Sequence, residues 1–164
     1  MGPGKDDVLH EALLNSYRIL PPRIYDFKKM MYTPGYAGED FLNIDPYFIS
    51  DKKKKEGICL SVKGLSNGAV AVLYPGVIKK LVEFMDGGFY VVFSSVHEAL
   101  IYSSKLCSLE ELENLLRTSN ARMTFQKEFL TDKVYYYCKE EDKFIMLRGS
   151  MKMLVTTIRM DEEN

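Results

Sequence analysis

The stretch that decides the fold runs from residue 58 to residue 102 and reads ICLSVKGLSNGAVAVLYPGVIKKLVEFMDGGFYVVFSSVHEALIY. It opens with two runs rich in branched and apolar residues, Ile58–Lys63 and Gly68–Leu73. Residues 64–67, Gly-Leu-Ser-Asn, lie between them and have the composition of a turn. This pattern predicts an antiparallel hairpin.

A helix and two strands are expected in the rest of this stretch. Pro75 stands where a helix can begin without its missing amide hydrogen, and Gly87 stands where a left-handed C-cap is expected. Between them the helical spacing predicts an apolar stripe of Val77, Ile78, Leu81, Val82 and Met85. The continuous apolar run Phe89–Phe93 is typical of a buried central strand, and Ala99–Tyr102 follows as a further short strand.

Upstream, the spacing predicts a first helix that Asp6 or Asp7 caps and that the two prolines at residues 21–22 end. Its expected buried stripe is Val8, Leu9, Ala12, Leu13 and Tyr17. A shorter amphipathic helix is expected over Ile24–Met31. Tyr32–Pro46, which contains prolines and glycines, is expected to be an irregular loop.

Four consecutive lysines, Lys52–Lys55, lie between the strand-like runs Tyr47–Ser50 and Ile58–Lys63. Asp51 and Glu56 flank the lysines, so opposite charges lie within a Debye length of about 8 Å. We therefore expect a solvated turn or extended loop here rather than a basic binding patch.

Downstream, Ser108 and Glu111 form a capping box at the start of a third helix. Its expected buried stripe is Leu109, Leu112, Leu115 and Leu116, and Asn120 is the expected stop. Val134–Cys138 and Phe144–Arg148 predict a second hairpin. A last strand is expected within residues 151–160, which hold a run of strand-favouring residues.

Together these elements predict an α+β fold. We expect a mostly antiparallel mixed sheet of about five to seven strands, with three main helices packed on one face. The length of 164 residues suits a single domain over residues 1–164. Within it, a helical segment over about residues 6–31 precedes an α/β core over about residues 47–160.

The composition restricts the classes of partner. Lysine and arginine total 22 and aspartate and glutamate total 23, so no broad basic field exists and no nucleic-acid partner is expected. No stretch approaches 18 apolar residues and no signal peptide is recognisable, so we expect a cytoplasmic protein without a membrane partner. Cys59, Cys107 and Cys138 lack the spacing of a disulfide framework or a zinc site, and no metal or cofactor is expected.

One polar cluster stands out, Ser94-Ser95-Val96-His97-Glu98, between two apolar strands. Serine, histidine and glutamate can supply a nucleophile, a base and an orienting carboxylate. Neighbours on an extended segment point to opposite faces, however, so the side chains of His97 and Glu98 should diverge. Three interpretations stay open: a polar turn that supports the fold, a polar binding site, and a catalytic site.

Two motifs of this chain resemble an uncharacterised bacterial family, domain-of-unknown-function family 5688. They are residues 67–76, Asn-Gly-Ala-Val-Ala-Val-Leu-Tyr-Pro-Gly, and residues 94–98, Ser-Ser-Val-His-Glu. Residues 19–24 and residues 130–135 are also similar, and the resemblance is to the C-terminal part of longer family members. Two positions depart from the family: Phe93 stands where a proline is usual, and Lys133 where a histidine is usual. The resemblance supports the fold and marks the cluster, but it implies no activity.

Two functional classes follow. The preferred one is a non-enzymatic intracellular interaction or ligand-binding module with an unidentified protein or small molecule as partner. The alternative is a small hydrolase-like or transferase-like enzyme with a site around His97. The candidate binding cluster is Ser94, Ser95, His97, Glu98 and Asn67. No residue is assigned a catalytic role, because no second motif completes a catalytic set around His97.

Overall fold

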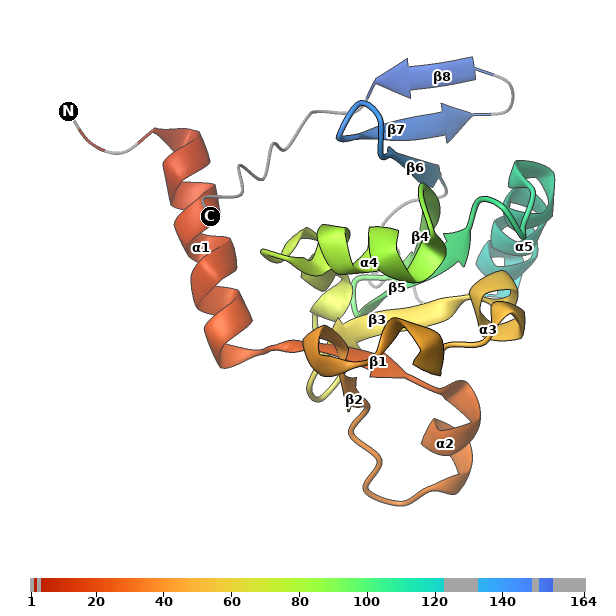
Figure 1. Cartoon of the computed structure of the whole chain (residues 1–164), viewed down its shortest axis with the longest axis horizontal. Coiled ribbons are helices and arrows are strands. Elements are labelled where there is room, and N and C mark those ends of the chain that lie inside the picture. The colour runs from red at the N-terminus through yellow and green to blue at the C-terminus, as the bar shows by residue number, and fades with distance from the viewer. Residues whose placement is uncertain (1, 3, 123–132, 149–150, 155–164) are drawn as a thin grey trace.

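The computed structural model describes residues 2, 4–122, 133–148 and 151–154. Its strands are β1 (Pro22–Tyr25), β2 (Glu39–Asp40), β3 (Ile58–Val62), β4 (Phe89–Ser95), β5 (Glu98–Ser103), β6 (Val134–Cys138), β7 (Lys143–Arg148) and β8 (Met151–Leu154). They form one sheet in the order β2-β1-β3-β5-β4-β6-β7-β8 (Figure 1). Every described strand pair is antiparallel.

Helices complete the described elements. The α-helices are α1 (Lys5–Ile19), α2 (Phe27–Tyr32), α3 (Asp51–Glu56), α4 (Val77–Met85) and α5 (Leu109–Arg122). Three short 3₁₀ helices are η1 (Phe41–Asn43), η2 (Pro46–Phe48) and η3 (Gly68–Leu73). The expected α+β class is confirmed.

Both faces of the sheet carry a hydrophobic core. On β4, Val91 packs in the larger core together with Leu81 of α4. Val92 points to the opposite face, where Leu112 and Leu116 of α5 join a second core. The expectation that helices cover one face is therefore wrong, since α4 and α5 lie on opposite faces (Figure 1). The apolar run of β4 explains the difference, because both of its sides have to be buried.

The central elements and the C-terminal hairpin are confirmed: α4, β4, β5, and β6 paired with β7. At the end of α4 it is Asp86, with φ 55°, that takes the left-handed conformation expected of Gly87; a short polar side chain tolerates this region. The last strand covers Met151–Leu154, and residues 155–160 lie outside the described residues.

The capping box of α5 is present. The amide of Ser108 donates to the Glu111 carboxylate at 2.9 Å, and the amide of Glu111 donates to the Ser108 hydroxyl at 3.2 Å. Two expectations for this helix are wrong: α5 continues past Asn120, and Leu115 is 42% exposed. Leu112 and Leu116 supply the buried contact instead, because they face the sheet.

The expected strand over Gly68–Leu73 is wrong, because these residues form η3. β3 pairs instead with β1 on one side and β5 on the other, so both of its edges are occupied. The small residues of η3 allow its backbone to pack against the sheet, with Ala71 and Val72 buried in the larger core.

Three predictions, for residues 24–31, 47–50 and 52–55, are also wrong. Ile24–Met31 divides into the end of β1 and α2, since the side chain of Ile24 belongs to the sheet core. Tyr47–Ser50 is not a strand, because Asp45 caps the 3₁₀ helix η2. Lys52–Lys55 is not a solvated turn, because Ser50 caps α3 and Gly57 ends it.

The first helix forms as expected and ends before Pro21, but its cap and stripe differ. Gly4 is the N-cap, and the Asp7 carboxylate accepts a hydrogen bond from the Gly4 amide at 3.1 Å. Only the C-terminal half of α1 contacts the larger core, through Leu13 and Tyr17. Val8, Leu9 and Ala12 are exposed because the N-terminal half of the helix projects away from the sheet (Figure 1).

Candidate functional site

The predicted polar cluster surrounds the tight turn between β4 and β5. Ser95 pairs with Glu98 across the turn, and the strand register shifts between Val92 and Ser95. The Ser95 hydroxyl accepts a hydrogen bond from the His97 amide at 3.0 Å. The Ser94 hydroxyl donates to a Glu98 carboxylate oxygen at 2.9 Å. These two side-chain hydrogen bonds stabilise the turn between β4 and β5.

Asn67 joins this cluster from the start of η3. Its backbone amide donates to Nδ1 of His97 at 3.0 Å, and the backbone amide of Ala69 donates to the Val96 carbonyl at 3.1 Å. The Ser61 hydroxyl donates to the His97 carbonyl at 2.5 Å. The structure therefore brings all five predicted residues together. The hydrogen bonds of the Asn67 and Ala69 amides connect η3 to the turn between β4 and β5.

The same bonds define the chemistry that the cluster can perform. A serine nucleophile has to pass its proton to a base, and the Ser94 hydroxyl donates its single hydrogen to Glu98 rather than to His97, so the serine–histidine pair of the enzyme hypothesis is not formed here. Because Nδ1 of His97 accepts a hydrogen bond, the neutral ring carries its proton on Nε2. Beside Glu98, burial raises the pKa of the Cys59 thiol to about 12, so this thiol stays protonated and unreactive. A binding role for the cluster stays a prediction.

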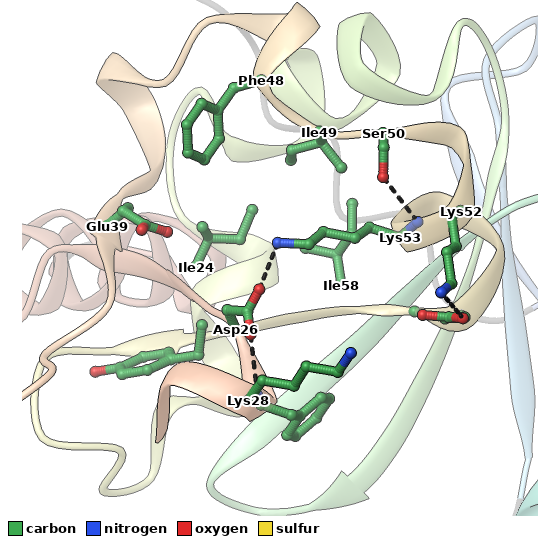
Figure 2. Close-up of a pocket in the computed structure, with 14 residues that line it drawn as sticks. Ile24, Asp26, Lys28, Glu39, Phe48, Ile49, Ser50, Lys52, Lys53 and Ile58 are labelled. Atoms are coloured by element: carbon green, nitrogen blue, oxygen red, sulfur yellow. Dashed lines mark hydrogen bonds and ion pairs between the residues drawn. The ribbon is translucent and has the colours of Figure 1, made fainter. Parts of the chain in front are cut away.

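A pocket of about 270 Å³ lies where β3 begins, at the opposite end of this strand from Ser61 and the polar cluster (Figure 2). Sequence reasoning missed this pocket. Ile24 of β1, Ile49 after η2 and Ile58 of β3 line it, and all three are buried in the larger core. Phe27 and Phe48 also line the pocket and are exposed. The pocket therefore combines an apolar floor with an aromatic rim.

An ion pair connects the elements on two sides of this pocket. Asp26 caps α2 by accepting hydrogen bonds from the amides of Lys28 at 2.9 Å and Lys29 at 3.2 Å. Its carboxylate also accepts a hydrogen bond from the ammonium of Lys53, which reaches across from α3 (Figure 2). The Lys53 ammonium is the main reason that the pKa of Asp26 is lowered. The Asp26–Lys53 pair thus fixes α3 relative to the end of β1.

Close packing also fixes the chain where α3 meets β3. Gly57 has a φ of 103°, and a Cβ atom there would lie 2.7 Å from the Tyr102 ring. Only glycine fits both the conformation and the space. Gly57 lines the pocket, so the packing of its backbone against the Tyr102 ring fixes this part of the pocket wall.

The remaining charges of the pocket are mostly paired. Glu39 binds the Lys29 ammonium at 2.9 Å, and Glu56 lies 3.8 Å from the Lys52 ammonium. Lys28 lines the pocket, but within the described part of the chain its ammonium has no ion-pair partner. Each acidic side chain of the pocket therefore faces a lysine other than Lys28.

Part of this pocket could have been found from local signals. Ser50 and Asp51 followed by Gly57 have the composition of a helix cap, an acidic first turn and a stop. The lysines between them hide the helix, because they provide no apolar stripe. Nothing local indicates that Lys53, rather than one of its three lysine neighbours, pairs with Asp26.

The described residues contain neither a candidate metal centre nor a helix that could cross a membrane. No group of three or more histidine, cysteine, aspartate or glutamate side chains there could hold a metal ion. Among those same residues, no helix combines the length and apolar character needed to cross a membrane.

Comparison with known proteins assigns a family and nothing finer. No curated protein and no solved structure matches the chain. The model of a family of unknown function, DUF5688, matches residues 1–139. Since this match covers most of the 164 residues, the chain belongs to the DUF5688 family.

Proposed function

We propose that this chain is a non-enzymatic module that binds a small molecule in the pocket between β1, η2 and α3. The observation that carries the proposal is the apolar floor of Ile24, Ile49 and Ile58 beneath a rim of aromatic and charged side chains. Ligand pockets combine such apolar walls with a few placed polar groups.

The size of the pocket restricts its ligand. Its volume of about 270 Å³ is slightly below the roughly 300–1,000 Å³ that is usual for ligand pockets. An engineered cavity of about 150 Å³ already accepts benzene. A ligand with one ring or a short chain therefore fits this pocket.

Contacts within the chain hold the walls of the pocket in place. The Asp26–Lys53 pair joins α2 to α3, and Gly57 packs against Tyr102 at the start of β3. A site that is already ordered loses less conformational entropy on binding. This preorganisation supports ligand binding at this place.

The enzyme alternative around His97 receives less support. The described bonds of Ser94, Ser95 and Nδ1 of His97 close the turn and anchor η3. For His97 to act as the base, Ser94 would have to exchange Glu98 for His97, and Nδ1 of His97 would have to release Asn67. A non-enzymatic module requires no such rearrangement.

Two aromatic neighbours on η2 provide the test. Phe48 lines the pocket and is 59% exposed, whereas Tyr47 is 95% exposed and does not line it. We expect ligand-observed NMR with apolar fragments to find binders, and Phe48→Ala to weaken them about fivefold. Tyr47→Ala, the matched control, should leave the dissociation constants unchanged within about twofold. Equal losses in both variants, or no binder at all, would contradict the proposal.

A further inference from the structure

We infer that the pocket selects small monoanions, such as carboxylates, that carry a short apolar body. This inference names the ligand class and rests on the proposed function. It comes from the distribution of charge around the pocket together with the apolar floor.

The acidic side chains of the pocket are already matched by lysines. Asp26 is paired with Lys53, and Glu39 is paired with Lys29. Glu56 faces Lys52, although this pair is long and exposed. A cationic ligand would have to displace one of these lysines, so the pocket disfavours an amine.

Lys28 is the lysine of this pocket whose ammonium has no acidic partner among the residues that the structure describes. In Figure 2 its side chain leaves the start of α2 and runs beneath the Asp26–Lys53 pair, with its ammonium on the side of the pocket where Lys52 lies. Its backbone amide is already used by Asp26, so only the ammonium is free to bind a ligand. A lysine ammonium is a compact point charge that suits a single negative group.

The charge and the floor belong to one pocket. Ile24 and Ile58 line the same pocket as Lys28 and are each 5% exposed. A ligand that placed its anionic group at Lys28 would lay its apolar body on these isoleucines. One unmatched cation balances one negative charge, which favours a carboxylate over a doubly charged phosphate ester.

Three probes that share an alkyl chain and differ in their charged or polar group separate the effect of charge from that of apolar contact: hexanoate, 1-hexanol and hexylamine. We expect hexanoate to bind the full chain about three- to fivefold more tightly than 1-hexanol, and hexylamine to bind more weakly than both. The advantage of hexanoate should shrink at high salt, because the lysine is exposed. Dissociation constants come from NMR titration of the amide signals.

Lys28→Met should lower the affinity for hexanoate to that for 1-hexanol and leave 1-hexanol binding unchanged. Lys63→Met is the matched control, since Lys63 is exposed and lies beyond the far end of β3 from Ile58. If wild-type protein binds hexanoate no more tightly than 1-hexanol, or if both variants weaken hexanoate equally, the charge inference is wrong while the pocket proposal stands. If neither hexanoate nor 1-hexanol binds, the proposed function is wrong, and so is the inference that rests on it.

Discussion

Gly68 shows how one residue can decide a connection in this fold. A Cβ atom at this position would lie 2.0 Å from the Ser61 hydroxyl, 2.7 Å from the Val62 nitrogen and 2.9 Å from the His97 carbonyl. The first neighbour is a side chain, but the other two are main chain and cannot rotate away. Glycine at residue 68 therefore permits η3 to begin against both β3 and the strand turn.

Gly68→Ala is accordingly expected to lower the free energy of unfolding by at least about 2 kcal/mol, because it forces the backbone apart. Urea denaturation measures the change. The double variant Ser61→Ala/Gly68→Ala should recover little, since Val62 and His97 still clash through the main chain. Ser66→Ala, at an exposed neighbour, is the control and should stay within about 0.5 kcal/mol. A Gly68→Ala protein as stable as the wild type would disprove this close approach.

Sequence predicts such residues only when their partners are near along the chain. Ser108 and Glu111 are three residues apart, so their reciprocal bonds follow from spacing alone. The atoms of Ser61 and His97 that exclude a Cβ atom at Gly68 come close to it only in the folded structure. The polar cluster was found because its members are consecutive, whereas the contact with Asn67 depends on tertiary structure.

The helix α3 is anchored by a partner that is distant in the sequence. It has six residues, and none of them is buried. Such a short polar helix is marginal by itself. Its Ser50 cap and the Lys53–Asp26 pair supply contacts that hold it beside α2. Local pattern favoured a turn here because the ion pair that anchors the helix joins residues far apart in the sequence.

A double-mutant cycle measures this anchor. With Asp26→Asn and Lys53→Met, we expect a coupling energy of about 0.5–1 kcal/mol in urea denaturation at neutral pH. Lys52→Met is the matched control, because the Lys52 ammonium pairs at 3.8 Å with Glu56 rather than with Asp26. A Lys52 cycle with Asp26 as large as the Lys53 cycle would show that general charge, not this contact, stabilises α3.

The same cycle has a defined pH dependence. The folded-state pKa of Asp26 is lowered, so the ionised carboxylate stabilises the fold. That contribution is fully present above the unfolded-state pKa of about 3.9 and is lost as the pH falls through the lower folded-state pKa. The coupling should therefore stay constant from pH 7 to about pH 5 and disappear in stronger acid. A coupling that faded as the pH rose above 5 would have the wrong sign for this carboxylate.

At the scale of the whole molecule, a sheet with a core on each face separates α4 from α5. The apolar run of β4 allowed the strand to be predicted, but a run that is apolar on both sides does not say which helix covers which side. The leucines of α5 show the same limit. Leu112 and Leu115 both belong to the predicted stripe, yet only Leu112 meets the second core.

These two leucines test the two-faced architecture. Leu112 is 1% exposed, so Leu112→Ala should cost about 2–4 kcal/mol in the free energy of unfolding. Leu115→Ala removes the same atoms from a side chain that is 42% exposed and should cost about 0.5 kcal/mol or less. Thermal or urea unfolding of both variants decides the point, and equal losses would place α5 differently on the sheet.

The central claim is that a ligand enters the pocket at one end of β3 rather than the polar turn at the other. A two-dimensional amide NMR spectrum recorded with and without 1-hexanol tests it directly, because each end has its own reporters. We predict shifts for the amides of Ile49, Lys53 and Gly57, which line the pocket, and unchanged signals for Asn67, Gly68 and His97. Shifts confined to Asn67, Gly68 and His97, or no shift at either end, would contradict the account.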